Sequence, residues 1–231
     1  MDAAHMIRLS SGFTGVLLAG GRGERFRASA GRADADKLLA TLPDGRAVAA
    51  AAAQTLLRAL PAVIAVIRPG VPALRAVLED AGCDVLETPD AVRGMGASLA
   101  CAARALQAAG ASMPPAQRQP GPVGETHGTA ADASASSRPA GVVVALADMP
   151  WVPVRAVRAV ATAAAAHRIA APVHHGRRGH PVAFAWDLLP QLALLDGDEG
   201  ARALLRSLGV HEVSCDDPGV LRDVDTVGDL R

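Results

Sequence analysis

The sequence predicts an α/β fold, in which helices cover both faces of a parallel or mostly parallel sheet. Short apolar runs that are typical of buried parallel strands alternate with stretches of helical spacing. Half of the 231 residues are apolar, which is enough for one domain with a full core. Aromatic residues make up only 2% of the chain and tyrosine is absent, so we expect a core of alanine, valine and leucine.

The expected strands and helices follow one another in a regular order. The first strand, residues 14–18, is an apolar run that ends in glycines, as a buried strand does where it enters a loop. Four similar runs follow, and four stretches of helical spacing lie between or after them. The further strands are 63–67, 83–86, 142–146 and 169–171, and the helices are 46–60, 72–81, 97–109 and 153–167. The last third adds a strand at 180–185, helices at 186–195 and 199–207, and a strand at 210–213, which we expect to complete one side of a cleft.

Residues 110–139 differ in composition from the rest of the chain. They are rich in proline, glycine, serine, alanine and glutamine, and lack the apolar periodicity that would offset the entropy of ordering them. We therefore predict a single domain over residues 1–231 with a flexible loop insertion at 110–139. The loop is either a tolerated insertion or a segment that docks a partner.

Charge and composition exclude several classes of protein. The 23 basic residues balance the 23 acidic ones, so no overall positive field exists to hold a nucleic acid. No apolar run approaches the roughly 18 residues needed to cross a bilayer. Cys83, Cys101 and Cys215 form no CxxC pattern and indicate neither a disulfide framework nor a thiolate zinc site. We therefore expect no nucleic-acid partner, no membrane partner and a location in the reducing cytoplasm.

A glycine-rich segment, Leu18-Ala19-Gly20-Gly21-Arg22-Gly23, comes directly after the first expected strand. Glycines there let the backbone turn tightly and present N–H groups to phosphate oxygens, and Arg22, Arg25 and Lys37 add positive charge. The segment lacks the Gly-Lys-Ser/Thr of a Walker A loop, and Phe26 stands where a dinucleotide fingerprint needs its third glycine. It predicts a phosphate-binding loop of another kind, or else a glycine turn with solvated arginines.

Carboxylates follow two other segments. Asp148 comes two residues after the expected strand 142–146. In open α/β sheets, ligands bind outside the carboxyl ends of the strands. Asp223 and Asp225 lie two residues apart and face the same way if the backbone is extended. One carboxylate from each segment suits Mg²⁺, which prefers hard oxygen ligands. The alternatives are a helix N-cap for Asp148 and a turn residue for Asp225.

Two weaker motifs complete the set. Gly94-Met95-Gly96-Ala97-Ser98 precedes an expected helix and either admits a base or ribose against the backbone or forms a loop with a helix cap. Arg177-Arg178-Gly179-His180-Pro181 leads into a strand and either grips an anionic acceptor or forms a basic turn.

Together, and in this order, these motifs resemble the MobA-like nucleotidyltransferases of molybdenum cofactor maturation, and most closely the MocA-like cytidylyltransferase branch. The resemblance runs from Thr14 to about Leu230 apart from the long loop. It rests on the motifs above together with Arg25-Phe26, Asp36-Lys37, Gly197-Asp198-Glu199-Gly200-Ala201-Arg202 and Asp223-Val224-Asp225-Thr226.

The resemblance implies a Rossmann-like three-layer sandwich of the nucleotide-diphospho-sugar transferase type, with a mostly parallel central sheet. It also implies an enzyme that uses Mg²⁺ or Mn²⁺ to join CMP from CTP, or GMP from GTP, to the phosphate of molybdopterin with release of pyrophosphate. The receiving partner would be a molybdoenzyme or its chaperone. The implied catalytic residues are Lys37, Arg25 and Asp148, and the implied metal ligands are Asp148 and Asp225. The implied nucleotide-binding residues are Leu18, Ala19, Gly20, Gly21, Arg22, Gly23, Lys37, Gly94, Gly96 and Ser98, and the implied acceptor-binding residues are Arg178, Gly179, His180 and Pro181.

Two departures from the family pattern bear on these expectations. Residues 28–35 separate Phe26 from Asp36-Lys37, whereas the family usually joins these motifs within a few residues, so we expect a more mobile loop here. Gly20-Gly21 is the form associated with guanylyl enzymes, whereas Arg178-Gly179-His180-Pro181 favours the cytidylyl side. The alternatives that stay open are a guanylyltransferase, a sugar-phosphate acceptor, a non-catalytic cofactor-delivery protein and, with least support, an oxidoreductase.

Overall fold

The strands of the computed structural model, which describes residues 7–9, 12–111 and 139–231, form one sheet. The strand order is β3-β2-β1-β4-β7-β5-β6, and β8 pairs with β5. β1, β2, β3 and β4 run parallel, β8 is parallel to β5, and β7 is antiparallel to both of its neighbours. The strands are β1 (Phe13–Ala19), β2 (Val63–Ile67), β3 (Asp84–Glu87), β4 (Gly141–Leu146), β5 (Ile169–His174), β6 (Arg177–Arg178), β7 (Val182–Ala185) and β8 (His211–Ser214).

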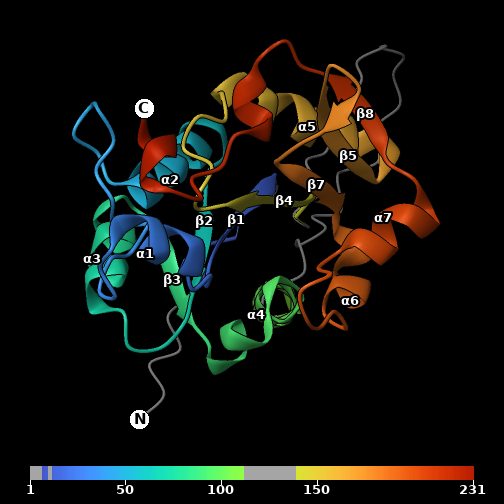
Figure 1. Cartoon of the computed structure of the whole chain (residues 1–231). Helices are drawn as coiled ribbons and strands as arrows, with labels where there is room; N and C mark the ends of the chain where they lie inside the picture. The colour runs from blue at the N-terminus through green and yellow to red at the C-terminus, as the bar shows by residue number, and fades with distance from the viewer. Residues whose placement is uncertain (1–6, 10–11, 112–138) are drawn as a thin grey trace, which may run out of the picture.

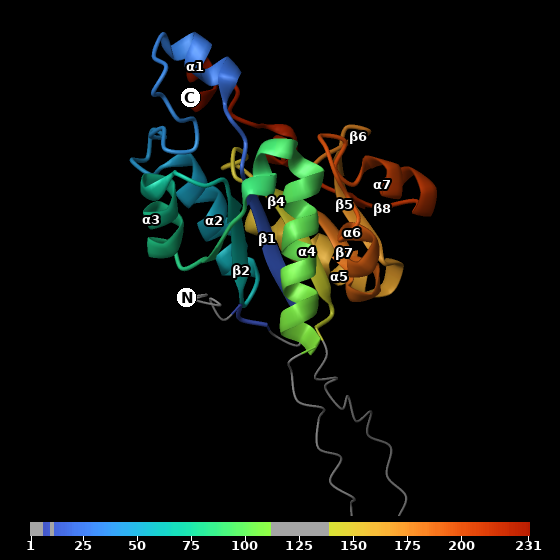
Figure 2. The same ribbon diagram turned by 90° about the horizontal axis from the view of Figure 1, so that it is seen from below.

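Helices cover both faces of this sheet (Figure 1). α2 and α5 lie on one face, and α4 and α6 lie on the opposite face (Figures 1 and 2). The helices are α1 (Glu24–Ala30), α2 (Val48–Ala59), α3 (Pro72–Asp80), α4 (Met95–Ala111), α5 (Val154–His167), α6 (Leu189–Leu192) and α7 (Arg202–Leu208). Short 3₁₀ helices are η1 (Pro89–Arg93), η2 (Trp186–Leu188), η3 (Pro218–Leu221) and η4 (Val227–Leu230).

Alternate residues of the central strand β1 feed two separate cores, because successive side chains of a strand point to opposite faces. Leu17 packs into the core that contains Leu56 of α2 and Val157 of α5. Val16 packs into the core that contains Leu106 of α4. All seven residues of β1 are buried, as expected for a parallel strand covered on both faces. The predicted α/β class is therefore confirmed, and so is the expected core of alanine, valine and leucine.

The structure differs from the predictions at several boundaries. α4 begins at Met95 and not at residue 97, so most of the expected glycine loop at 94–98 is the first turn of a helix. The helix expected at 186–195 is split into η2 and the four-residue α6. α1 was not expected, because Phe26 is its one buried residue and leaves no apolar period to recognise. The first two residues of the expected loop at 110–139 belong to α4, which ends at Ala111, and residues 112–138 of that prediction lie outside the described part of the chain.

No helix within residues 7–9, 12–111 and 139–231 is long and apolar enough to span a bilayer.

Candidate functional site

Two of the expected parts of the site, the glycine-rich loop and Asp148, follow the ends of β1 and β4. β1 and β4 are parallel neighbours in register from Phe13 with Gly141 to Leu18 with Leu146, so the segments that follow them emerge side by side. The N–H of Ala147 donates to the carbonyl of Leu18 at 3.0 Å and continues this contact one residue further. The glycine-rich loop and Asp148 are therefore adjacent although they are far apart in the sequence.

Close packing explains Gly20 of the loop, and backbone conformation explains Gly23. A Cβ atom at Gly20 would lie 2.9 Å from the Cβ of Ala91 and 3.3 Å from the hydroxyl of Ser98, so the loop can pass η1 and α4 only without a side chain. Gly23 has a φ of 63°, in the left-handed region that favours glycine, and it precedes α1. The backbone of the loop is thus held against α4 while its other side stays open.

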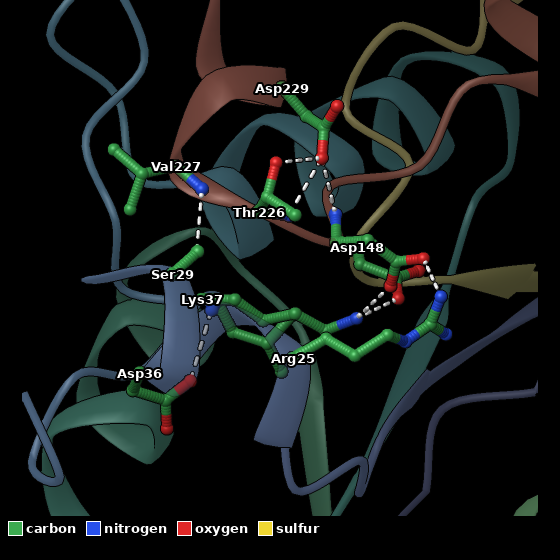
Figure 3. A network of polar contacts seen from close by, with 10 residues as sticks. Arg25, Ser29, Asp36, Lys37, Asp148, Thr226, Val227 and Asp229 are labelled. Atoms are coloured by element: carbon green, nitrogen blue, oxygen red, sulfur yellow. Dashed lines mark hydrogen bonds and ion pairs between the residues drawn. The ribbon is translucent and has the colours of Figure 1, made fainter. Parts of the chain in front are cut away.

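Two cations and two carboxylates meet beside this loop (Figure 3). Lys37 Nζ lies 2.5 Å from Asp148 Oδ2 and 3.7 Å from Asp225 Oδ1. The guanidinium of Arg25 forms an ion pair with the other oxygen of Asp225. Only 11% of the Lys37 side chain is exposed, against 77% for Arg25, so Lys37 is fixed in the cluster while Arg25 lies at its rim.

The second oxygen of Asp148, Oδ1, is buried and has no hydrogen-bond partner among the described residues. Leaving a buried carboxylate oxygen unpaired costs about 1–3 kcal/mol or more. A divalent cation with hard-oxygen preference would pair this atom, and Asp225 supplies a second carboxylate in the same cluster. Asp148 and Asp225 therefore fit a magnesium or manganese site.

The C-terminal segment holds Asp225 near Asp148, since Lys37 contacts both carboxylates. The N–H of Val224 donates to the carbonyl of Asp148 at 2.8 Å. Asp229 Oδ2 accepts from the N–H of Asp225 at 3.2 Å and from the N–H and hydroxyl of Thr226 at 2.6 and 2.7 Å. These hydrogen bonds hold the pKa of Asp229 below its usual range, with the Thr226 hydroxyl the largest cause. Asp229 therefore stays charged and keeps the turn that carries Asp225 in place.

Two cavities border the cluster, and a further cavity adjoins the first of them. The first, of about 450 Å³, adjoins the third, of about 430 Å³, at Arg22, Glu24 and Asp198, and adjoins the second, of about 300 Å³, at Leu18 and Met95. The first is further lined by Gly20, Gly21, Ala91, Val92, Gly94, Ser98, Leu146 and Asp148. The second is further lined by Leu99, Val144, Arg178, Gly179, His180, Val182, Phe184, Glu199, Gly200, Ala201, Arg202 and Leu205. The third is further lined by Gly23, Arg25, Phe26, Lys37 and Asp225.

Most of the expected site residues line these cavities, and three do not. Ala19 is a buried residue of β1, and Pro181 stands between His180 and β7. Gly96 serves packing, since its N–H donates to the carbonyl of Gly197 at 2.8 Å and a Cβ atom there would lie 2.5 Å from the carbonyl oxygen of Asp196.

Three of the four expected acceptor residues, Arg178, Gly179 and His180, line the second cavity. Arg178 Nη2 lies 3.4 Å from Glu212 Oε1, and His180 Nδ1 is buried without a partner among the described residues. Burial lowers the pKa of His180 and the charge of Arg202 lowers it further, while the carboxylate of Asp148 and a hydrogen bond with the Val144 backbone oppose this shift. The imidazole is therefore neutral near pH 7.

The structure also adds residues that the motifs did not single out. Asp198 lines the first and third cavities, and Arg202 lines the second; both belong to a segment that carried the resemblance without an assigned role. Arg68 follows β2 directly and touches the glycine loop, since its Nη1 donates to the carbonyl of Gly21 at 2.9 Å. The rule that ligands gather at the carboxyl ends of strands could have found Arg68, because it follows the apolar run 63–67.

A glycine loop and a lysine–carboxylate cluster at the carboxyl edge of a mostly parallel sheet define the class of α/β nucleotidyltransferases. The family model described as MobA-like NTP transferase domain matches residues 15–213. The chain therefore belongs to the MobA-like NTP transferase family.

Similar solved structures share this fold over almost the whole chain. The Rv0371C complex with manganese from Mycobacterium tuberculosis H37Rv is 26% identical, with a TM-score of 0.66 over 95% of this chain and 96% of that chain. The Rv0371c homologue from Mycobacterium sp. strain JC1 is 25% identical, with a TM-score of 0.69 over 96% and 94%. A nucleotidyl transferase from Methanothermobacter thermautotroptrophicus, Mth528, is 21% identical and shares the fold, with a TM-score of 0.69 over 94% and 93%. The Rossmann-like fold type that the resemblance implied is thus confirmed. A comparison with curated protein sequences gave no match.

Proposed function

We propose that this nucleotidyltransferase uses Mg²⁺ or Mn²⁺ to transfer CMP from CTP to the terminal phosphate of molybdopterin, with release of pyrophosphate. The observation that carries the metal-dependent step is the unpaired, buried Oδ1 of Asp148 beside Asp225 and Lys37. The manganese in the 26% identical Rv0371C structure supports the same assignment. A bound divalent cation would offset charge on the phosphoryl oxygens.

The chain's own residues account for positioning. The first and third cavities adjoin along the glycine loop, so a triphosphate there would pass from the open side of Gly21 towards Lys37 and Arg25. Both cations would then exchange their carboxylate partners for phosphate oxygens and would neutralise the departing pyrophosphate. An acceptor phosphate is already anionic near neutral pH, so no strong general base is needed.

The second cavity supports an acceptor with an apolar face and an anionic group. Its lining includes Leu99, Val182 and Phe184, none of which can hydrogen-bond through its side chain. Arg178 and Arg202 line the same cavity and can pair with a phosphate. This lining is compatible with molybdopterin, and the resemblance of Arg178-Gly179-His180-Pro181 to the cytidylyl branch favours molybdopterin over a sugar phosphate.

Cytidylyl specificity rests on the resemblance of Arg178-Gly179-His180-Pro181 to the cytidylyl branch. A guanylyltransferase remains the alternative, because Gly20-Gly21 is the form associated with guanylyl enzymes. In this proposal the product passes to a molybdoenzyme or its chaperone.

The test is pyrophosphate release by the purified protein with Mg²⁺ and molybdopterin, in parallel reactions with CTP, GTP and ATP. We expect release with CTP alone. Release with GTP alone would assign the chain to the guanylyl branch. Silence with all three triphosphates, but release when sugar phosphates replace molybdopterin, would overturn the acceptor. Nucleotide binding without release to any acceptor would instead indicate a cofactor-delivery protein.

A further inference from the structure

The glycine loop and Lys37 are joined by a connection with little buried surface of its own. It contains α1 and residues 31–36, and Phe26 is the buried residue of this helix. The arginine and aspartate at 32 and 34 pair with each other on the surface, where their side chains are more than 70% exposed. Local structure alone therefore does not fix the distance between the loop and the lysine.

Arg68 connects the two segments from a third element. β2 ends one residue before it, and β2 pairs with β1 up to Ala19, so Arg68 starts from a fixed place beside the loop. Its Nη1 donates to the carbonyl of Gly21 at 2.9 Å, and its Nη2 lies 3.4 Å from Asp36 Oδ2. The side chains of Arg68 and Asp36 are only 17% and 18% exposed.

Asp36 extends this connection around Lys37. Its other oxygen, Oδ1, accepts from the N–H of Leu38 at 3.0 Å, so the carboxylate of the residue before Lys37 is bonded to the backbone of the residue after it. The side chain of Lys37 then reaches Asp148 at 2.5 Å. A continuous series of polar contacts thus runs from the Gly21 carbonyl through Arg68 and Asp36 to the carboxylate cluster.

We propose that Arg68 is a positioning residue that sets the glycine loop and Lys37 at the separation a triphosphate requires. It is not among the described residues that line the three cavities, so it acts through Gly21 and Asp36 and not by touching the ligand. The role depends on the planar fork of the guanidinium, which holds two acceptors at once, whereas a lysine ammonium is a mobile point charge. The inference rests on the proposed nucleotidyl transfer at this site.

The test compares Arg68→Lys and Arg68→Gln with the wild type and with Arg75→Gln. Arg75 is a matched control, because its guanidinium also joins two acceptors, Glu79 at 3.0 Å and Glu87 at 2.8 Å, but lines none of the three cavities. We expect both Arg68 variants to lower kcat of pyrophosphate release about 10- to 100-fold, since small misplacements of positioning groups cost this much. Arg75→Gln should stay within about twofold of the wild type.

Two further readouts separate positioning from charge and from folding. Asp36→Asn combined with Arg68→Gln should be no slower than Arg68→Gln alone, because both act through one connection. Wild-type kcat in Arg68→Lys would show that charge suffices and would overturn the inference, as would full additivity in the double variant. Arg68→Lys keeps the charge of the buried pair, so it remains a test if Arg68→Gln does not fold.

Nucleotide affinity tests the role of Arg68 separately from the proposed transfer reaction. It is measured by titrating each protein with CTP and with GTP in the presence of Mg²⁺. If the wild type binds nucleotide but releases no pyrophosphate with any acceptor, the proposed transfer fails. In that case we expect nucleotide to bind about tenfold more weakly to both Arg68 variants than to the wild type and Arg75→Gln. Equal affinities in all four proteins would overturn the role of Arg68.

Discussion

The two oxygens of Asp148 have opposite environments. Oδ2 bonds to Lys37, while Oδ1 is buried without a partner among the described residues. A half-satisfied buried carboxylate lowers the stability of a protein unless a ligand completes it. Such a residue is therefore expected at a site that binds a cation, and not in a purely structural ion pair.

Asp148→Asn should abolish most of the activity without unfolding the protein. The amide keeps the shape of the side chain but removes the charge that holds the metal and Lys37, so we expect a fall in kcat/KM of at least about 100-fold. The measurement is pyrophosphate release, with binding of Mn²⁺ followed by titration. Asp187→Asn is the control, since Asp187 pairs with Arg168 at 2.7 Å and lines none of the three cavities. Normal turnover by Asp148→Asn would refute the metal assignment.

His180 should make the protein less stable in mild acid. Because its folded pKa is lowered below the ordinary value of 6.5, mainly by burial, the unfolded chain binds a proton at higher pH than the folded one. The stability that the neutral ring contributes is present above about pH 6.5 and is lost as the pH falls through the folded pKa. Between pH 7.5 and 5.5, urea denaturation should show a larger loss of unfolding free energy for the wild type than for His180→Gln, by at most about 1.4 kcal/mol per pH unit. Equal losses in the two proteins would contradict this cause.

At the scale of elements, the first turn of α4 contributes to two of the three cavities. Met95 lines the first and second cavities. Gly94 and Gly96 pack directly against the loop at Asp196 and Gly197, where a side chain at either glycine would collide with backbone atoms. The ion pair between Arg93 and Asp196 also joins this loop to the segment just before α4. The two glycines thus let the loop that carries Asp198, and that leads to Arg202 at the start of α7, pack onto the helix.

Gly96→Ala should destabilise the protein although alanine favours a helix. The added methyl group would lie 2.5 Å from the carbonyl oxygen of Asp196, and backbone moves away only at a cost of about 1–3 kcal/mol. We expect a lower Tm in thermal denaturation. Gly21→Ala is the matched control for stability, because nothing lies within 4 Å of a Cβ atom there. A wild-type Tm for Gly96→Ala would show that the loop can shift freely.

At the scale of the whole molecule, two cores and a sheet covered on both faces bury groups that would react in the open chain. Cys83 is 5% exposed, just before β3. Burial, assisted by the charge of Asp84, raises the pKa of its thiol to about 12, despite the nearby Arg8. The thiolate, which is the reactive form, is therefore almost absent near neutral pH.

Cys83 should react with a thiol reagent only when the fold opens. In the native protein we expect Cys101 and Cys215, which are partly exposed, to be labelled much faster than Cys83. Cys83 should become as reactive as the others in denaturant. Peptide mapping after timed labelling measures the three rates. Rapid native labelling of Cys83 would mean that the edge of the sheet at β3 opens easily.

The sequence by itself determined the class of fold and the chemistry available to it. Gly20 and Asp148 could be recognised in the sequence because each follows an apolar run, and Gly94 and Gly96 because glycines mark turns. Strand ends, turns and their charges are local patterns. The same locality explains why β2 was predicted with its observed bounds. It also explains why α1 was missed, since a helix with one buried residue has no period to detect.

Only the tertiary structure decided which of these residues meet. Lys37 and Asp148 are 111 positions apart, and their contact depends on the register of β1 with β4 and on the course of the connection after α1. The same holds for the contact of Arg68 with Gly21, which gives the unassigned Arg68 a positioning role. It holds too for the contact of Gly96 with Gly197, which makes Gly96 a packing residue where a ligand contact was expected. Such contacts join segments that share no local pattern, so their geometry is set by the packing of the whole sheet and its helices.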